Sequence, residues 1–474
     1  MKKIIIVLCI LCIVVHTGRA NQSKDSNNAA ALLSKQEKIY ALSLLWKELH
    51  YNFAYPDRLQ KANIDSLYMA FLPKIEQAEG KEYYRTLQAF LAHFNDGHTL
   101  ISLNPLMDAS LEDLPQIRLR IIDGKIILIN TAKSMESKIP FGSEIIKINQ
   151  IPVLKYLKDT ISPYVSAPTP YLKLLYSVRM AEMGYSYSFF NITIRTPSNE
   201  ESDIQLIRNF FATGGEEWAL HFSFSSEQPA IEIQIIHDNI GYIQLNTFYP
   251  DAVVDTINQV FQQMLPQLHL CKGLIIDIRN NSGGTDLAWW GIAQHLILGD
   301  TFTQGVGFSR VHDSFYKAKG QVSDAALMEA VGSTARDSPY IDYYRGLIME
   351  ELPYEYPNPV DDSLKLNQPL IILSNHNTAS AAEGFLLAMR DAKRGIIMGE
   401  PSAAAMGQPL LLLLPGDAIA LICAAQMKAI DGTDFSQTGI LPDIPVKWDL
   451  DAYLHGRDNV LEQAIEEMRK LINE

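Results

Sequence analysis

Gly273-Leu-Ile-Ile-Asp-Ile-Arg-Asn-Asn-Ser-Gly-Gly284 is the stretch that decides the fold. Its first half is an almost continuous apolar run of strand length, which is typical of a strand buried on both faces. Its second half is a turn rich in small residues, and the apolar segment 287–298 that follows predicts a helix. Glycines in such a turn let the backbone approach a ligand closely and direct amide groups at an anion, although a tight turn without a ligand would need the same residues.

The same order of strand, turn and helix returns later in the chain. Its repetition predicts a largely parallel sheet with crossover helices, so the fold class is α/β. Residues 305–366 show no clear period, and we expect them to form a long insertion over the core. The other expected strands are residues 231–236, 240–245, 369–373 and 396–399, and the other expected helices are residues 380–393 and 458–472.

The first half of the chain has two different patterns. From Leu32 to Phe94 apolar residues recur every three or four positions, which predicts helices that end at the Asn95-Asp-Gly97 turn and present His98. Residues 114–212 change to short alternating strands, with a hairpin turn at Asp123-Gly124. We therefore expect a helical region followed by one small β-rich module.

Composition limits the classes of partner. The chain has 474 residues, of which 47% are hydrophobic and 20% charged, so it is a globular protein long enough for several domains. Its net charge of −14 argues against a nucleic-acid partner, because phosphates are neutralised by basic surfaces.

The N-terminus resembles a secretory signal. Lys2-Lys3 is followed by the apolar run 4–15 and by the small residues of Gly18-Arg-Ala20, so we expect cleavage near Ala20. A retained membrane anchor is the alternative. No later segment is long and apolar enough to cross a membrane, and we expect an exported protein, with the periplasm as its compartment.

No metal or cofactor is expected from the motifs. Cys271 and Cys423 lie in apolar runs, which favours two buried thiols over a disulfide. The sequence contains no CxxC, HExxH or clustered His and Cys spacing, and no phosphate-binding or dinucleotide-binding loop.

A second turn, Ser374 to Glu383, also follows a buried strand and opens a helix. Ser380 at this position can simply be an N-cap that forms a capping box with Glu383. The functional alternative is a serine nucleophile whose own helix offers the Ala381 amide to a developing oxyanion. An amide of the neighbouring Gly283 turn would complete that oxyanion hole.

Four pieces of this chain together resemble the C-terminal processing (tail-specific) serine peptidases, including their tricorn-like branch. The pieces are residues 273–284, Thr378-Ala-Ser-Ala-Ala-Glu383, Gly399-Glu-Pro401 and Gly439-Ile-Leu-Pro-Asp443. The resemblance implies a ClpP/crotonase-like catalytic core with serine peptidase activity on unfolded or C-terminal segments. Residues 141–149 are similar to the peptide-binding PDZ modules of these enzymes, and Asn95-Asp-Gly-His-Thr99 resembles an early segment of tricorn-like members.

The base is where the chain departs from the family pattern. In the processing branch a lysine base lies in the loop after the Gly-Glu-Pro strand, but here residues 402–408 contain none, and no lysine occurs between Lys393 and Lys428. The tricorn-like branch implies a histidine instead, and His98 fits that position. The simpler role for His98 is to bond the last carbonyls of the preceding helix.

The residue that orients His98 is left open by the sequence. The tricorn-like branch implies a group a few residues before Gly439, where Asp434, Ser436 and Gln437 are all possible. His376 is a second possible base, which we expect the turn to direct elsewhere. Glu383 and Asp443 are expected to be structural.

The resulting prediction is an exported serine peptidase that acts on a polypeptide substrate without cofactor or metal, with no stable membrane span after signal cleavage. Its expected parts are residues 1–20 (signal peptide), 21–112 (helical region), 113–212 (PDZ-like module) and 213–474 (peptidase core). The main alternative is a catalytically silent peptide-binding protein on the same scaffold. A crotonase-like enzyme acting on acyl-thioesters would explain the oxyanion turn but not the serine at the helix start.

Overall fold

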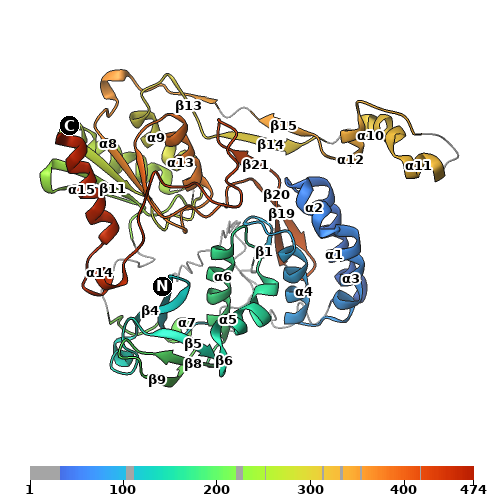
Figure 1. Cartoon of the computed structure of the whole chain (residues 1–474), viewed down its shortest axis with the longest axis horizontal. Helices are drawn as coiled ribbons and strands as arrows, with labels where there is room; N and C mark the ends of the chain where they lie inside the picture. Colours follow the sequence, from blue (N-terminus) through green and yellow to red (C-terminus); the bar gives the residue numbers. More distant parts are fainter. Residues whose placement is uncertain are drawn as a thin grey trace, which may run out of the picture.

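The computed structural model describes residues 33–102, 112–219, 228–250, 252–311, 314–330, 335–352, 355–416 and 418–473. A helical region, a β-rich module and an α/β core follow one another along the chain (Figure 1). The expected signal peptide, residues 1–20, lies outside the described residues. Within the described part, no helix has the length and apolar character needed to cross a membrane.

The helical pattern of the first region is confirmed. Helix α1 begins after Ser34, which forms a capping box with Glu37. Leu42, Leu45 and Leu49 of α1 recur at helical spacing and are fully buried in a core shared with the other helices. The helices are α1 (Lys35–Asn52), α2 (Pro56–Ala62), α3 (Ile64–Gln77) and α4 (Lys81–Ala92).

A small sheet joins this region to a distant part of the chain. Strand β1 (Leu100–Ser102) pairs antiparallel with β20 (Ala418–Cys423), and β20 pairs with β19 (Pro409–Leu414). Leu414, Ala420 and Ile422 belong to the same buried cluster as the helices. Because β1 begins two residues after His98, this pairing ties the His98 turn to the C-terminal part of the chain.

The β-rich module is an antiparallel sheet with strand order β3-β4-β5-β8-β9, and β6 pairs with β5. The predicted hairpin turn is confirmed, because Ile122 pairs with Lys125 and both Asp123 and Gly124 have positive φ. The strands are β2 (Glu112–Asp113), β3 (Ile117–Ile122), β4 (Lys125–Thr131), β5 (Glu144–Ile148), β6 (Ile151–Pro152), β7 (Gly184–Tyr185), β8 (Phe189–Arg195) and β9 (Glu201–Ile207). Its helices and helical turns are η3 (Lys133–Met135), α5 (Val153–Tyr156), η4 (Leu157–Ile161), η5 (Ser162–Tyr164), α6 (Pro170–Glu182) and α7 (Phe210–Thr213).

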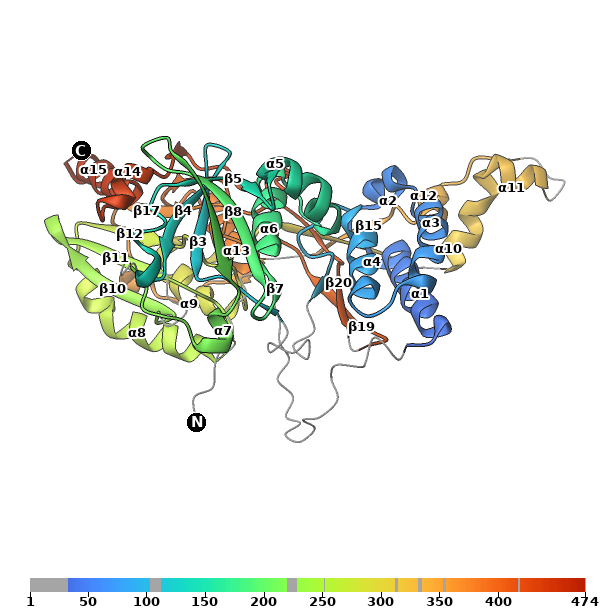
Figure 2. The same cartoon turned by 90° about the horizontal axis from the view of Figure 1, so that it is seen from below.

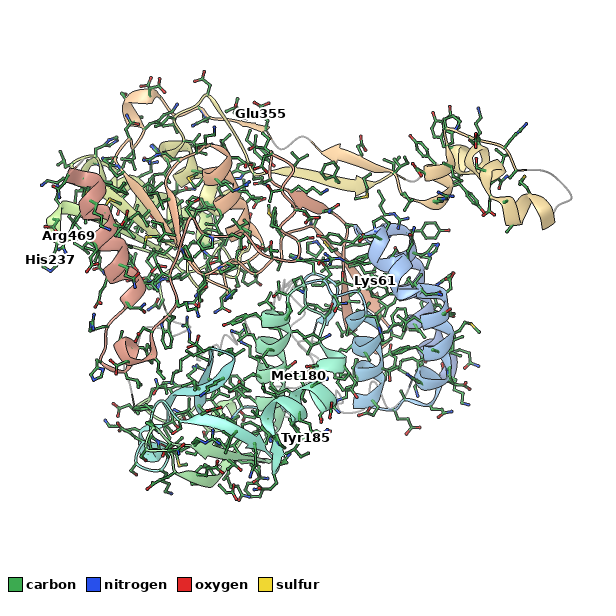
Figure 3. All side chains as sticks on the ribbon, viewed as in Figure 1. Lys61, Met180, Tyr185, His237, Glu355 and Arg469 are labelled. Atoms are coloured by element: carbon green, nitrogen blue, oxygen red, sulfur yellow. The ribbon has the colours of Figure 1, made fainter. Side chains whose placement is uncertain are left out.

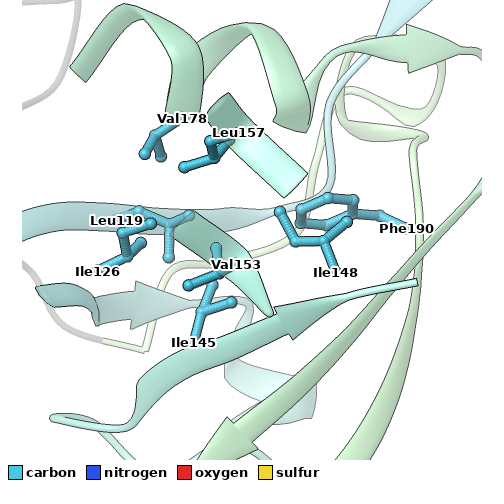
Figure 4. Close-up of a pocket in the computed structure, with 8 residues that line it drawn as sticks. All are labelled: Leu119, Ile126, Ile145, Ile148, Val153, Leu157, Val178 and Phe190. Carbon is cyan, nitrogen blue, oxygen red and sulfur yellow. The ribbon is translucent and has the colours of Figure 1, made fainter. Parts of the chain in front are cut away.

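Apolar side chains between the sheet and α6 form the core of the module (Figure 4). A small apolar pocket there is lined by Leu119, Ile126, Ile145, Ile148, Val153, Leu157, Val178 and Phe190. The same buried cluster continues into the α/β core through Ala379, Ala403 and Ala405. The module and the core are therefore packed together.

The core sheet has the strand order β10-β11-β12-β17-β18-β22, in which the first five strands were predicted and the edge strand β22 was not. Within this sheet β11, β12, β17, β18 and β22 run parallel to one another, and β10 pairs antiparallel with β11. Adjacent residues of β12 face opposite sides of the sheet: Ile276 packs with α8, α9 and α13, and Ile275 packs with α15. The elements are β10 (Ile231–Ile236), η6 (His237–Asn239), β11 (Ile240–Leu245), α8 (Val253–Leu268), β12 (Gly273–Asp277), α9 (Leu287–Leu296), β17 (Leu370–Ser374), α13 (Ala381–Asp391), β18 (Ile396–Gly399) and β22 (Ile444–Pro445).

The C-terminal helix α15 (Asn459–Asn473) closes the second face of this sheet, and the short helix α14 (Leu450–Leu454) before it packs against Ile127 and Ile129 of β4. Arg469 Nε of α15 donates to Asp238 Oδ2 at 2.7 Å, next to His237 at the turn between β10 and β11 (Figure 3). Cys271 and Cys423 are buried free thiols, as predicted.

The expected insertion packs on the core only through its last part, where Tyr356 and Leu366 join the core cluster, and its helices do not cover the core. Helices α10, α11 and α12 extend away from the molecule past the N-terminal helices (Figures 1 and 2). Where the insertion leaves the molecule, it contacts helix α1: Arg310 donates to the His50 carbonyl, and Lys317 Nζ lies 5.0 Å from the centre of the Tyr51 ring. The elements are β13 (Thr301–Thr303), β14 (Val306–Arg310), α10 (Ser314–Gly320), η7 (Gln321–Ser323), α11 (Ala325–Ala330), α12 (Ile341–Arg345), β15 (Met349–Leu352), β16 (Glu355–Pro357), η8 (Asp362–Leu364) and, pairing with β14, β21 (Gln426–Lys428).

Candidate active site

The turns after β12 and β17 lie against each other at the carboxyl end of the core sheet. The amide nitrogen of Asn280 donates to Asn375 Oδ1 at 3.1 Å. In return, Asn280 Oδ1 accepts from the side-chain amides of Asn375 at 3.1 Å and Asn377 at 2.9 Å. Neighbouring parallel strands end at the same edge of a sheet, so the predicted residues of the two turns come together here.

Gly283 lies directly beside the start of α13. A Cβ added to Gly283 would come within 2.7 Å of the Ser380 Cβ and 3.0 Å of the Ala381 nitrogen. Gly283 also has φ of 91°, which L side chains rarely adopt. Only glycine therefore allows this approach of the two turns.

The two amides predicted for an oxyanion hole differ in their hydrogen bonds. The Gly283 amide donates to Asn281 Oδ1 at 2.9 Å, and the Asn281 side chain is itself held by the Leu245 carbonyl at 3.1 Å. The Ala381 amide, in the first turn of α13, makes no hydrogen bond to another described residue. In this structure only the Ala381 amide is available to an incoming oxygen.

Ser380 has an unusual backbone conformation, with φ 55° and ψ −122°. It forms the predicted capping box with Glu383, but N-cap residues ordinarily lie in the β region. A strained residue between a strand and a helix is typical of a functional side chain that its turn presents.

The Glu383 carboxylate joins the serine to the loop after β18. It is fully buried and accepts hydrogen bonds from the Ser380 amide at 3.0 Å, the Ser402 hydroxyl at 2.7 Å, and the amides of Ala404 and Ala405, both at 2.9 Å. Burial raises the pKa of Glu383 to about 7, although these donors oppose the shift. Its predicted structural role is thus visible as a link between two loops.

Neither lysine near the expected position of a base lies at this loop. Lys393 follows the end of α13, so the length of the helix, about 1.5 Å per residue, separates it from Ser380. Lys428 lies in β21, with its Nζ 5.6 Å from the centre of the Phe308 ring.

The His98 turn packs onto the same loop. A Cβ added to Gly97 would lie 2.8 Å from the Ala405 Cβ, and one added to Gly407 would lie 3.8 Å from His98 Nδ1. The Asp96 carboxylate holds the turn by accepting from the His98 amide at 2.9 Å and the Thr99 hydroxyl at 2.8 Å.

The His98 ring is fully buried. Within the described part of the chain, neither Nδ1 nor Nε2 has a hydrogen-bond partner. Burial lowers the pKa of His98 below its ordinary 6.5, while the nearby Asp96 charge acts in the opposite direction. A neutral imidazole with two unpartnered nitrogens costs roughly 1–3 kcal/mol of stability, which is expected of a group kept for function.

None of the residues predicted to orient His98 is hydrogen-bonded to its ring. The Ser436 hydroxyl accepts from Arg58 at 3.2 Å, and the Ser436 amide donates to Asp434 Oδ1 at 2.9 Å. Asp434 Oδ2 accepts from Gln426 at 3.3 Å. No hydrogen bond of the Gln437 side chain is present within the described residues.

Sequence reasoning missed Arg58 and Ser166, which fix the His98 turn from outside. Arg58 donates to the Asn95 carbonyl at 2.8 Å as well as to Ser436. The Ser166 hydroxyl, in the β-rich module, donates to the Asp96 carbonyl at 2.8 Å and accepts from its amide at 3.2 Å. No local motif marks either residue, because both act across long sequence distances.

The other polar residues of the turns have structural contacts. His376 stacks on Tyr171, with ring centres 4.0 Å apart, and burial lowers the pKa of His376. Asp443 accepts from the Ile397 amide at 2.8 Å, at the start of β18. Arg279 pairs with Asp277 through two hydrogen bonds.

An α/β core that presents a strained serine at a helix start, beside a glycine turn, has the arrangement expected of a serine-type peptidase. Residues 239–446 match the family model described as peptidase family S41. This part of the chain is therefore similar to the S41 peptidases.

Two curated relatives support the match. The chloroplastic C-terminal processing peptidase of Tetradesmus obliquus is 27% identical over 207 residues, which are 43% of this chain and 34% of the relative. The chloroplastic carboxyl-terminal-processing peptidase 2 of Arabidopsis thaliana is 24% identical over 208 residues, 44% of this chain and 32% of the relative. This chain thus spans about a third of the length of the curated relatives that it matches.

A solved structure supports the fold over almost the whole chain. Mature CPAF complexed with lactacystin superposes with a TM-score of 0.64 and 14% identity, covering 93% of this chain and 99% of that one. The predicted mixed α/β fold class is confirmed. The assignment of the β-rich module as a PDZ-like domain stays a prediction.

Proposed function

We propose that this protein hydrolyses peptide bonds in unfolded or C-terminal segments of polypeptides, with Ser380 as nucleophile and His98 as base. One series of contacts carries the proposal. Glu383 binds the amides of both Ser380 and Ala405, and Ala405 in turn touches Gly97, next to His98. Residues far apart in the sequence thereby converge on one loop.

In the proposed reaction the Ser380 hydroxyl attacks the substrate carbonyl while His98 removes its proton. His98, neutral because it is buried, can accept that proton and return it to the leaving amine. The Ala381 amide stabilises the tetrahedral oxyanion. The Gly283 amide joins it once it exchanges Asn281 for the substrate oxygen.

The packing at Ala405 favours histidine over lysine as the base. The loop after β18 is where the processing peptidases have their lysine, and here the loop places alanines against the His98 turn. A Cβ added to Gly97 would already lie 2.8 Å from the Ala405 Cβ, so a side chain longer than alanine at position 405 has no room in this direction.

Ser436, Gln437 and Asp434 remain the proposed sources of an orienting group for His98. Ser436 has the best support, because Arg58 connects it to the turn that bears His98. The proposed parts of the chain are a helical region (21–112), a PDZ-like module (113–212) and a peptidase core (213–474), after an N-terminal signal (1–20) that directs export to the periplasm.

Labelling with a fluorophosphonate probe tests the proposal. Wild-type protein is expected to be labelled and to degrade a denatured protein, and Ser380→Ala is expected to lose both properties. His98→Ala should be labelled far more slowly while unfolding at a similar temperature. Wild-type protein that resists the probe but binds denatured polypeptide would instead indicate the silent peptide-binding scaffold.

A further inference from the structure

The proposed reaction needs His98 in one of its two neutral forms. To take the proton of Ser380 on one ring nitrogen, the imidazole must carry its hydrogen on the other, and a partner at that second nitrogen selects this form. Neither Nδ1 nor Nε2 is hydrogen-bonded to a described residue. Asp434 and Ser436 each bind another side chain, so their observed contacts do not select the form.

Cys423 lies opposite His98 at the end of the β1–β20 pairing. Leu100 of β1 pairs with Leu421 of β20, and the same antiparallel register continued by two residues sets His98 opposite Cys423. A hydrogen bond supports this continuation, because the Cys423 amide donates to the Thr99 hydroxyl at 3.0 Å. Opposite residues of an antiparallel pair have Cβ atoms about 4.5–5.5 Å apart, so the thiol and the imidazole are neighbours.

The surroundings of Gly407 show which ring nitrogen is on the side of the thiol. A Cβ added to Gly407 would lie 2.6 Å from Cys423 Sγ and 3.8 Å from His98 Nδ1. Nδ1 is therefore the nitrogen near the sulfur, and Nε2 is the one left for Ser380. Both Cys423 and His98 are fully buried, so water does not compete for the bond between them.

The thiol proton already has an acceptor. Cys423 Sγ donates to the Ala425 carbonyl at 3.2 Å. Burial and the Asp96 charge raise the pKa of Cys423 well above its ordinary value, so the group keeps this proton. With the proton directed at Ala425, the sulfur can meet Nδ1 only as an acceptor. An acceptor at Nδ1 selects the imidazole that has its hydrogen on Nδ1 and a lone pair on Nε2.

We propose that Cys423 is the positioning residue of His98: its sulfur accepts a hydrogen bond from Nδ1–H and leaves the Nε2 lone pair for the proton of Ser380. The bond forms when the ring turns towards the sulfur, and Gly407 leaves room there because it has no side chain. Sulfur is a weak acceptor, but a buried Nδ1–H without any acceptor is costlier. No proton leaves Cys423 during the reaction.

This inference rests on the proposed role of His98 and deepens it, and the form of the ring can be measured without turnover. In protein labelled with 15N-histidine, the nitrogen shifts distinguish hydrogen on Nδ1 from hydrogen on Nε2, and His98→Gln identifies the signals. Ser380→Ala protein should carry its hydrogen mainly on Nδ1. Adding Cys423→Ala should lower the ratio of the two forms about fivefold, the scale of one neutral hydrogen bond. Adding Cys423→Ser instead should keep the ratio, because a hydroxyl can make both bonds.

Kinetics of the otherwise wild-type protein give a second measurement. Cys423→Ala should lower kcat about fivefold with KM nearly unchanged, and Cys423→Ser should recover most of the loss. Gly407→Ala keeps the thiol but must displace the sulfur, so it should also lower kcat, and Gly407 does not have a positive φ that would confuse the result. Cys271→Ala, which removes a buried thiol elsewhere in the core, is the matched control and should have wild-type kcat.

The outcomes separate this inference from the proposed peptidase activity. A ratio of ring forms that changes in Ser380→Ala/Cys423→Ala and is kept by serine supports Cys423 even if no peptide is cleaved. An unchanged ratio would overturn the inference even if the wild-type protein is an active peptidase. A ratio that responds to Ser436→Ala, Gln437→Ala or Asp434→Ala, and not to Cys423→Ala, would give the role to that residue. Equal losses of kcat in Cys423→Ala and Cys423→Ser would likewise overturn it, because the thiol would then act only through packing.

Discussion

Gly97 lies directly against Ala405, so close that a methyl group on Gly97 would meet the Ala405 Cβ at 2.8 Å. Gly97 precedes the candidate base, and the Ala405 amide is bound by the same carboxylate that binds the Ser380 amide. This one contact therefore sets the distance between two loops that carry the candidate catalytic groups.

Gly97→Ala is expected to reduce kcat at least tenfold with little change in KM. The added methyl group must push the turn away from Ala405, which moves His98, and overpacking of this kind costs about 1–3 kcal/mol of stability. Gly97 does not have a positive φ, so the change tests the contact and not the backbone conformation. Steady-state kinetics and denaturant unfolding measure both effects.

The matched control removes the opposing methyl group. Ala405→Gly alone should have nearly wild-type activity, and Gly97→Ala/Ala405→Gly should recover much of the lost kcat. A Gly97→Ala protein with wild-type kcat would show that this contact does not position the base.

The pH dependence of kcat/KM should report His98. Burial lowers the pKa of His98 below its ordinary 6.5, so activity should rise with pH as the ring loses its proton, with a midpoint below that ordinary value. His98→Ala should abolish most turnover, and His376→Ala should keep both the activity and the profile. A profile that rises only in the alkaline range would indicate a lysine, and Lys393→Ala and Lys428→Ala would identify it.

Glu383 should make folding stability depend on pH. Its pKa is about 7 in the folded state and 4.5 ordinarily, so the folded protein binds this proton more tightly. The contribution is present below pH 4.5 and is lost as pH rises towards 7, by roughly 3 kcal/mol in total. The difference in unfolding free energy between wild type and Glu383→Gln, measured from pH 4.5 to 8, should follow this slope. A constant difference over that range would mean that Glu383 is ionised throughout.

Ser166→Ala should lower kcat although Ser166 lies in the β-rich module. The substitution removes both hydrogen bonds to the backbone of Asp96 and should cost about 1–2 kcal/mol of stability. Ser162→Ala, which loses a hydrogen bond to Ser177 elsewhere in the module, is the matched control and should retain wild-type kcat. If Ser166→Ala and Ser162→Ala have the same kcat, the β-rich module does not support the His98 turn.

The core sheet was predictable because its signals are local. Strands such as 273–277 are apolar runs of the right length, closed by turn residues, and the Asp123-Gly124 turn is fixed by two adjacent residues. The sequence also predicted that the turns after β12 and β17 meet, because the carboxyl ends of parallel strands lie at one edge of a sheet.

The surroundings of the candidate base were not predictable in the same way. The position of the His98 turn depends on the pairing of Leu100 with Leu421 and on Arg58 reaching Ser436, contacts that no local pattern encodes. The Asn281 side chain that occupies the Gly283 amide was likewise invisible, because the sequence shows which amides exist but not where they point.

The pairing of β1 with β20 has a consequence for biosynthesis. Strand β1 follows His98, yet its partner residues 419–421 are translated after Ser380, Glu383 and Ala405. A nascent chain that already contains both His98 and Ser380 therefore still lacks the strand that holds the His98 turn. Peptidase activity would appear only when synthesis is nearly complete, which protects the growing chain from its own active site.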